Sequence, residues 1–80
     1  TKVDARLQLA KQYLRKKDFP SAAREAENAL RLAPTSGSDE AVVKNLRASY
    51  ELLRDIFRSA SRPREERYAE RMIEKIPAVA

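Results

Sequence analysis

The stretch Leu9–Pro34, LAKQYLRKKDFPSAAREAENALRLAP, contains two helical patterns separated by one tight turn. The first pattern places Leu9, Ala10 and Tyr13 on one side of a helix, because residues three and four positions apart share a helix face. The second pattern repeats this spacing with mostly small residues, which are Ala22, Ala26, Ala29 and Leu30. Small side chains let two helix axes approach closely. The stretch therefore predicts a helical hairpin.

The ends of both helices of this hairpin can also be predicted. Asp18 is suited to cap the second helix, and Pro20 is tolerated in a first helical turn. Pro34 cannot continue the second helix, because it lacks the amide hydrogen that the helix needs. We therefore expect one helix from about Val3 to Lys16 and another from about Phe19 to Leu32.

A third and longer helix is expected after the turn-forming run Pro34–Ser38, from Asp39 to Ser59 or Ala60, with Ser38 as its N-cap. Its wide apolar face is predicted to be the main core, and consists of Val42, Val43, Leu46, Tyr50, Leu53, Ile56 and Phe57. Truncation of Leu46, Leu53 or Phe57 should cost most of the stability. A second flank, formed by Ala41, Ala48 and Leu52, is expected to stay partly outside this core.

Pro63 fits the first turn of a fourth helix, expected from about Arg64 to Ile76. Its apolar stripe consists of Tyr68, Ala69, Met72, Ile73 and Ile76. The three tyrosines of the chain all fall on such stripes, so we expect rings in the core and hydroxyls at its rim. The chain is predicted to be all-α, with four antiparallel helices arranged as two stacked helix–turn–helix hairpins; the alternative is a compact four-helix bundle.

The first hairpin resembles a tetratricopeptide repeat (TPR), a helix–turn–helix unit of about 34 residues. The positions that carry the resemblance are Leu9, Ala10, Tyr13, Ala22, Ala26, Ala29 and Pro34. The chain departs from the family pattern at Ala26, where the family has a large aromatic, at Arg6, where an apolar residue is usual, and at Lys17, which replaces a turn glycine. One clear repeat spans about 3–36, and a degenerate second repeat spans about 39–77.

Composition argues against an enzyme. The chain has no His and no Cys, which removes the commonest general base, the commonest thiol nucleophile and the usual zinc ligands. Gly37 is the only glycine, so a phosphate-binding glycine loop is not expected. We therefore predict no catalytic residues, no metal and no cofactor. No apolar run approaches the ~18 residues of a membrane span, and we expect residues 1–80 to be a single cytoplasmic domain from a longer protein.

The TPR resemblance implies a protein–protein interaction module, a scaffold or adaptor that binds a peptide segment in the groove lined by the first helix of each hairpin. Helical spacing places on that side the candidate partner-binding residues Leu7, Lys11, Leu14, Arg15, Lys44, Ala48 and Leu52. Cations beside an apolar floor favour a protein or peptide with acidic residues.

Two alternatives remain open from the sequence. The first 17 residues hold six basic residues against one acidic residue, so most of the net charge of +5 lies on the first helix. Such a basic helix could bind nucleic acid, although charge alone is a weak indication. The other alternative is a docking or dimerisation domain. We expect a monomer in dilute solution, with weak self-association through apolar surface left uncovered around Leu52.

Overall fold

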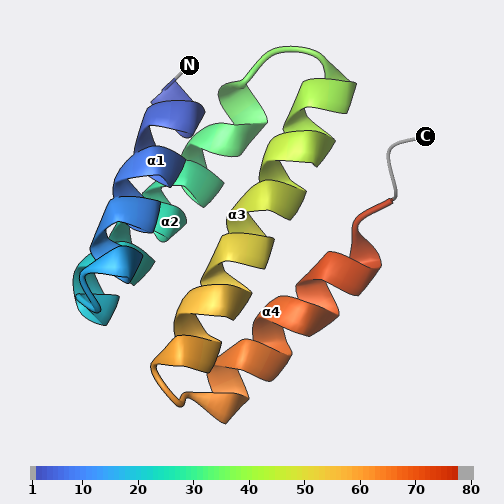
Figure 1. Cartoon of the computed structure of the whole chain (residues 1–80). Coiled ribbons are helices and arrows are strands. Elements are labelled where there is room, and N and C mark those ends of the chain that lie inside the picture. The colour runs from blue at the N-terminus through green and yellow to red at the C-terminus, as the bar shows by residue number, and fades with distance from the viewer. Residues whose placement is uncertain (1, 78–80) are drawn as a thin grey trace.

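The computed structural model describes residues 2–77, which form an all-helical domain (Figure 1). Its elements are α1 (Lys2–Arg15), α2 (Phe19–Leu32), the short 3₁₀ helix η1 (Ala33–Thr35), α3 (Asp39–Ser59) and α4 (Pro63–Lys75). The predicted bounds of α2 are confirmed, and α3 ends at Ser59. The bounds of α1 and α4 are each displaced by one residue from those expected.

Side-chain caps and prolines set the starts of three helices, as predicted. The carboxylate of Asp18 accepts a 3.4 Å hydrogen bond from the amide of Ser21 at the start of α2. The hydroxyl of Ser38 accepts a 3.2 Å bond from the amide of Ala41 at the start of α3. Pro63 lies in the first turn of α4, where its missing amide hydrogen costs nothing.

Both hairpins close through the same backbone geometry. Lys17 adopts a left-handed conformation (φ 61°), and the amide of Asp18 donates a 2.9 Å bond back to the carbonyl of Tyr13. The second turn repeats this pattern, with Ser61 left-handed (φ 57°) and the amide of Arg62 donating a 2.8 Å bond back into α3. This is the Schellman C-cap, in which glycine is the usual left-handed residue. The two turns are therefore structurally equivalent although their sequences differ.

The helices stack in chain order. α2 packs on α1, α3 packs on α2 much more than on α1, and α4 packs on α3, while α4 makes no extensive contact with α1 within the described residues. Figure 1 shows α1 and α4 on opposite sides of α3. The four helices thus form two antiparallel hairpins that pack on each other through α2 and α3 in one compact all-α domain.

The core is centred on the middle and C-terminal half of α3. The buried apolar residues are Val3, Leu7, Ala10, Ala22, Ala26, Ala29, Ala33, Tyr50, Leu52, Leu53, Ile56 and Ala69. The three buried alanines of α2 confirm its predicted stripe, and they allow α1 and α3 to approach it closely.

Two expectations about α3 were wrong. Leu52 is buried (7% exposed) and belongs to the core, so it does not leave apolar surface for a second copy. Leu46 is only half-buried, as are Val42 and Val43. The reason is the unequal length of α3 and α4: Arg47 Nη2 donates a 2.9 Å bond to the carbonyl of Ile76, just after α4 ends. The first turns of α3 therefore extend beyond the end of α4.

The buried rows of α1 and α4 also differ from the expected ones. Val3, Leu7 and Ala10 are buried on α1, whereas Leu9 and Tyr13 are half-buried. Only Ala69 is buried on α4, and Tyr68 is 58% exposed. Spacing identified the apolar sides of these helices, but the angle at which each helix meets its neighbour decides which row is covered.

Candidate functional site

The seven candidate partner-binding residues, which we call the α1/α3 face, divide into an apolar and a cationic set. Leu7 and Leu52 belong to one buried cluster, and Leu14 and Ala48 pack against that cluster. All four apolar residues therefore belong to, or pack against, the one core of the domain. Leu7 (8% exposed) and Leu52 (7% exposed) are mostly covered, so the accessible floor is formed chiefly by Leu14 and Ala48, which are half-buried.

The cationic residues of this face are Lys11 and Arg15 on α1 and Lys44 on α3, and all three are exposed. Lys11 and Arg15 are four residues apart, so they project from neighbouring turns of one helix side. None of the three forms an ion pair with a residue that the structure describes. Their charges are therefore available to a ligand.

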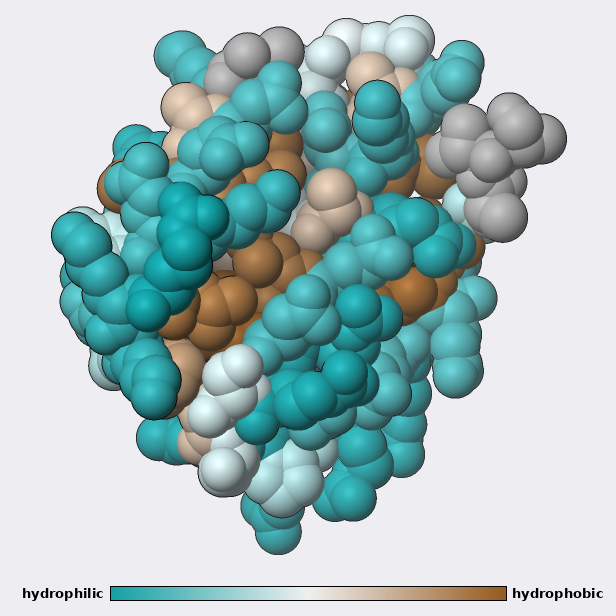
Figure 2. Space-filling model, viewed as in Figure 1, coloured by the Kyte–Doolittle hydropathy of each residue, from teal (hydrophilic) through white to brown (hydrophobic). Residues whose placement is uncertain are grey.

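Figure 2 shows hydrophobic surface, which we call the apolar strip, between the hydrophilic outer surfaces of α1 and α4. Half-buried Glu51 lies three residues after Ala48 on α3, and so adds one negative charge near the strip. The face thus combines a narrow apolar floor, three cations and one carboxylate.

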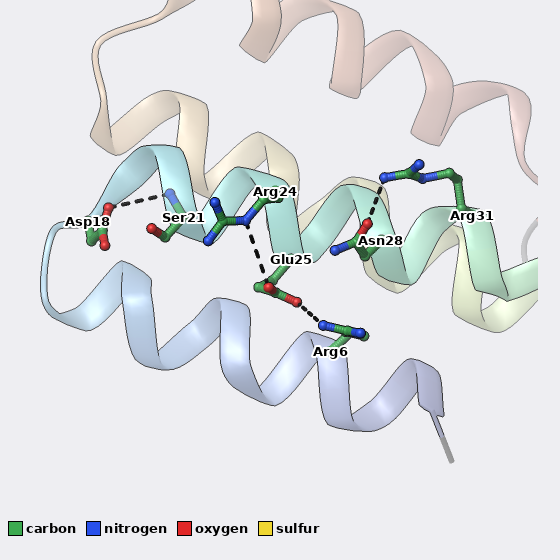
Figure 3. Close-up of polar contacts among 7 residues, drawn as sticks. All are labelled: Arg6, Asp18, Ser21, Arg24, Glu25, Asn28 and Arg31. Carbon is green, nitrogen blue, oxygen red and sulfur yellow. Dashed lines mark hydrogen bonds and ion pairs between the residues drawn. The ribbon is translucent and has the colours of Figure 1, made fainter.

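An ion pair that sequence reasoning missed joins α1 to α2. Arg6 Nη1 donates a 2.8 Å bond to Glu25 Oε1, and the side chain of Glu25 is only 8% exposed (Figure 3). The hydrogen bond from Arg6 lowers the pKa of Glu25 below its usual value, although burial alone would raise it. Arg6 was noted only as a departure from the repeat pattern. Glu25, nineteen residues along the chain, is the partner that makes this departure compatible with packing.

A second ion pair joins α3 to α4. Arg58 Nε donates a 2.8 Å bond to Glu66 Oε2, and this hydrogen bond raises the pKa of Arg58. Arg58 is well exposed, so the pair orients α4 more than it stabilises the fold.

Sequence reasoning also missed the exposure of Tyr68. The available signal was Arg64, which stands four residues earlier and shares its side of α4. A charged residue on the same helix side as an apolar one indicates a boundary between core and solvent. Tyr68 lies at such a boundary, and its ring meets that of Tyr50 edge to face.

Within 2–77 no group of three acidic side chains is placed to hold a metal ion. No helix in this range is both long enough and apolar enough to cross a membrane.

Comparison with known proteins finds no match: no protein family, no curated protein and no solved structure resembles this chain significantly. The resemblance to a tetratricopeptide repeat therefore depends on the residue pattern of the first hairpin.

Proposed function

We propose that this chain is a protein–protein interaction module of the TPR type, and that its α1/α3 face binds a peptide segment with acidic residues. One observation supports the proposal: Lys11, Arg15 and Lys44 are exposed without ion-pair partners among the described residues, on the two helices that also carry half-buried Leu14 and Ala48. The floor supplies apolar contact area, and the cations supply attraction and orientation.

The ligand that fits such a face is short and amphipathic. An apolar side chain would contact Leu14 and Ala48, and an acidic side chain or a terminal carboxylate would approach Lys11 and Arg15. Because Leu7 and Leu52 are largely covered, the ligand gains only modest apolar area, and charge contributes much of the selectivity. Glu51 should disfavour a second acidic residue placed near α3.

The test is selection of peptides from a random displayed library on the immobilised chain, followed by affinity measurements on the enriched sequences. We expect enrichment of peptides that pair an apolar residue with an acidic one. The double variant Lys11→Glu/Arg15→Glu should bind them about 5- to 30-fold more weakly, since each exposed charge contributes up to about 1 kcal/mol. The loss should be larger at low salt, where screening is weakest.

A matched control is Lys2→Glu/Lys16→Glu, which changes the net charge equally. Lys2 is on another side of α1, and Lys16 lies in the turn that follows α1. Equal loss in both double variants would show that binding follows overall charge, which is the behaviour expected of a basic helix bound to nucleic acid. Unchanged affinity in the Lys11/Arg15 variant, with its helical circular dichroism retained, would exclude the α1/α3 face.

A further inference from the structure

A second site lies away from α1. A pocket of about 460 Å³ opens between α2, α3 and α4, and none of its lining residues comes from α1. Its floor includes Leu53 and Phe57 of α3, and Leu30 of α2 forms one side. The size is within the range of small-ligand and side-chain pockets.

Two tyrosines form a corner of this pocket. The rings of Tyr50 and Tyr68 lie 6.5 Å apart at 71°, and both line the pocket together with Phe57. Tyr50 is buried, and burial raises the pKa of its hydroxyl, so the ring stays neutral at physiological pH. Tyr68 is 58% exposed, which is unusual among the large apolar side chains of this protein. Aromatic faces carry negative electrostatic potential and attract cations.

Acidic side chains stand on two walls of the same pocket. Glu27 comes from α2 and Glu65 from the first turn of α4. Neither forms an ion pair with any residue in the described range, so neither charge is compensated within the fold. The one cation that lines the pocket is Arg64, which is exposed. Two free carboxylates beside three aromatic rings form a site for a positively charged group.

We propose that this pocket binds an arginine side chain presented by a basic segment of a partner protein. A guanidinium is planar, stacks on aromatic rings and can donate to carboxylates on two sides, whereas an ammonium is a compact and more strongly hydrated charge. Leu30, Leu53 and Phe57 would contact the methylene stem. The site differs from the α1/α3 face in position and in the sign of the charge it selects, so the two proposals can fail independently.

The experiment is a proton NMR titration of the full chain with blocked Gly/Ser peptides that carry one central residue. The central residue is arginine, its neutral isostere citrulline, or lysine. We expect saturable shifts of the Tyr50 and Tyr68 ring signals with the arginine peptide, and several-fold weaker binding of the other two. Equal binding of the citrulline peptide, or no saturable shift with arginine, would overturn the proposal. Equal binding of the lysine peptide would contradict the choice of a guanidinium.

Variants of the pocket residues test separately how the Tyr68 ring and the charges of Glu65 and Arg64 affect arginine affinity. Tyr68→Phe should keep the arginine affinity, whereas Tyr68→Leu should lower it about two- to fivefold, because only the first retains an aromatic face. Glu65→Gln should weaken binding, and Arg64→Gln should strengthen it by removing the competing cation. Glu74→Gln, on an exposed position of α4 outside the pocket, is the control and should change nothing. Opposite signs for Glu65→Gln and Arg64→Gln are the decisive result, and equal signs would contradict the site.

Discussion

The guanidinium of Arg6 on α1 donates a 2.8 Å hydrogen bond to the carboxylate of Glu25 on α2, and so places a charged group inside the first hairpin (Figure 3). Arg24 Nε lies 4.0 Å from the other carboxylate oxygen, a weaker contact from the exposed side of α2. A buried carboxylate without a partner is costly, whereas a paired one gives direction to packing that alanines alone do not. Glu25 thus fixes the position of α1 along a helix whose buried face is otherwise small.

Glu25 should make the stability of the domain depend on pH. Its pKa is lower in the folded than in the unfolded chain, so its contribution is complete above the unfolded value of about 4.3 and is lost as pH falls through the folded pKa. Glu25→Gln should therefore lower the thermal midpoint at pH 7, and the difference from the parent chain should shrink in acid. Thermal unfolding followed by circular dichroism at several pH values measures this. Glu27→Gln, exposed on the same helix, is the control and should show no such difference.

Replacing Arg6 alone should lower the free energy of unfolding more than replacing both Arg6 and Glu25. Arg6→Met leaves a buried carboxylate without its main partner, which costs about 1–3 kcal/mol. The double variant Arg6→Met/Glu25→Met replaces both groups by apolar side chains of similar length and should recover much of that loss. A double-mutant cycle on unfolding free energies measures the coupling. Additive losses would contradict a direct interaction between these residues.

Ile56 is predicted to contribute most to the stability of the core. Ile56 is fully buried, and Ile56→Ala should cost about 2–5 kcal/mol of unfolding free energy. Leu46→Ala removes as many atoms from a half-buried position beyond the end of α4, so it should cost clearly less. Chemical denaturation of both variants gives the comparison. An equal or larger effect at Leu46 would show that the N-terminal half of α3 is covered more completely than the structure has it.

Glycine at either hairpin turn should stabilise the protein. Lys17 and Ser61 both adopt left-handed conformations, which cost an L-residue roughly 1–2 kcal/mol relative to its usual region. Glycine avoids this strain but loses more entropy on folding, so Lys17→Gly and Ser61→Gly should each stabilise by about 0.5–1 kcal/mol. Lys16→Gly, at the preceding position, should destabilise instead. Thermal midpoints of the three variants test the assignment of both Schellman turns.

Arg47 should hold the C-terminal end of α4. It donates a 2.9 Å bond to the carbonyl of Ile76, while its buried Nε has no hydrogen-bond partner among residues 2–77. Arg47→Met keeps the apolar stem but loses that bond, so it should cost about 1 kcal/mol and speed amide exchange in the last turn of α4. Arg67→Met, on an exposed position of the same helix, should leave exchange unchanged. Equal rates of amide exchange in both variants would mean that packing alone holds the C-terminal end of α4.

Helix positions could be predicted from the sequence because local chemistry sets them. Asp18 and Ser38 cap helices through their own side chains, and Pro34 and Pro63 restrict their own backbones, so no distant residue is needed. The burial of individual leucines could not be predicted in the same way. Leu52 and Leu46 both lie on apolar sides of α3. The contacts that α3 makes with its neighbours cover Leu52, whereas α4 ends too early to cover Leu46.

In the candidate sites, too, features set by one helix could be predicted, whereas features that need several helices could not. Spacing placed Lys11 and Arg15 on one side of α1, and the structure shows both exposed beside Leu14. The pocket at Tyr50 and Tyr68 could not be foreseen, because it needs Glu27 from α2 and Glu65 from α4 to face one space. Residues separated by nearly forty positions in the chain meet there only through the stacking of the hairpins.

The stacking of each helix on its sequence neighbour has a consequence for folding kinetics. Most of the packing joins α1 with α2, α2 with α3, and α3 with α4, so the chain need close only short loops before its contacts form. Domains with such local contacts fold in microseconds to milliseconds. α4, attached mainly to α3, should also open and close as a separate cooperative unit while the other helices stay folded. Hydrogen exchange should then give α4 a lower opening free energy than α2, which packs between α1 and α3.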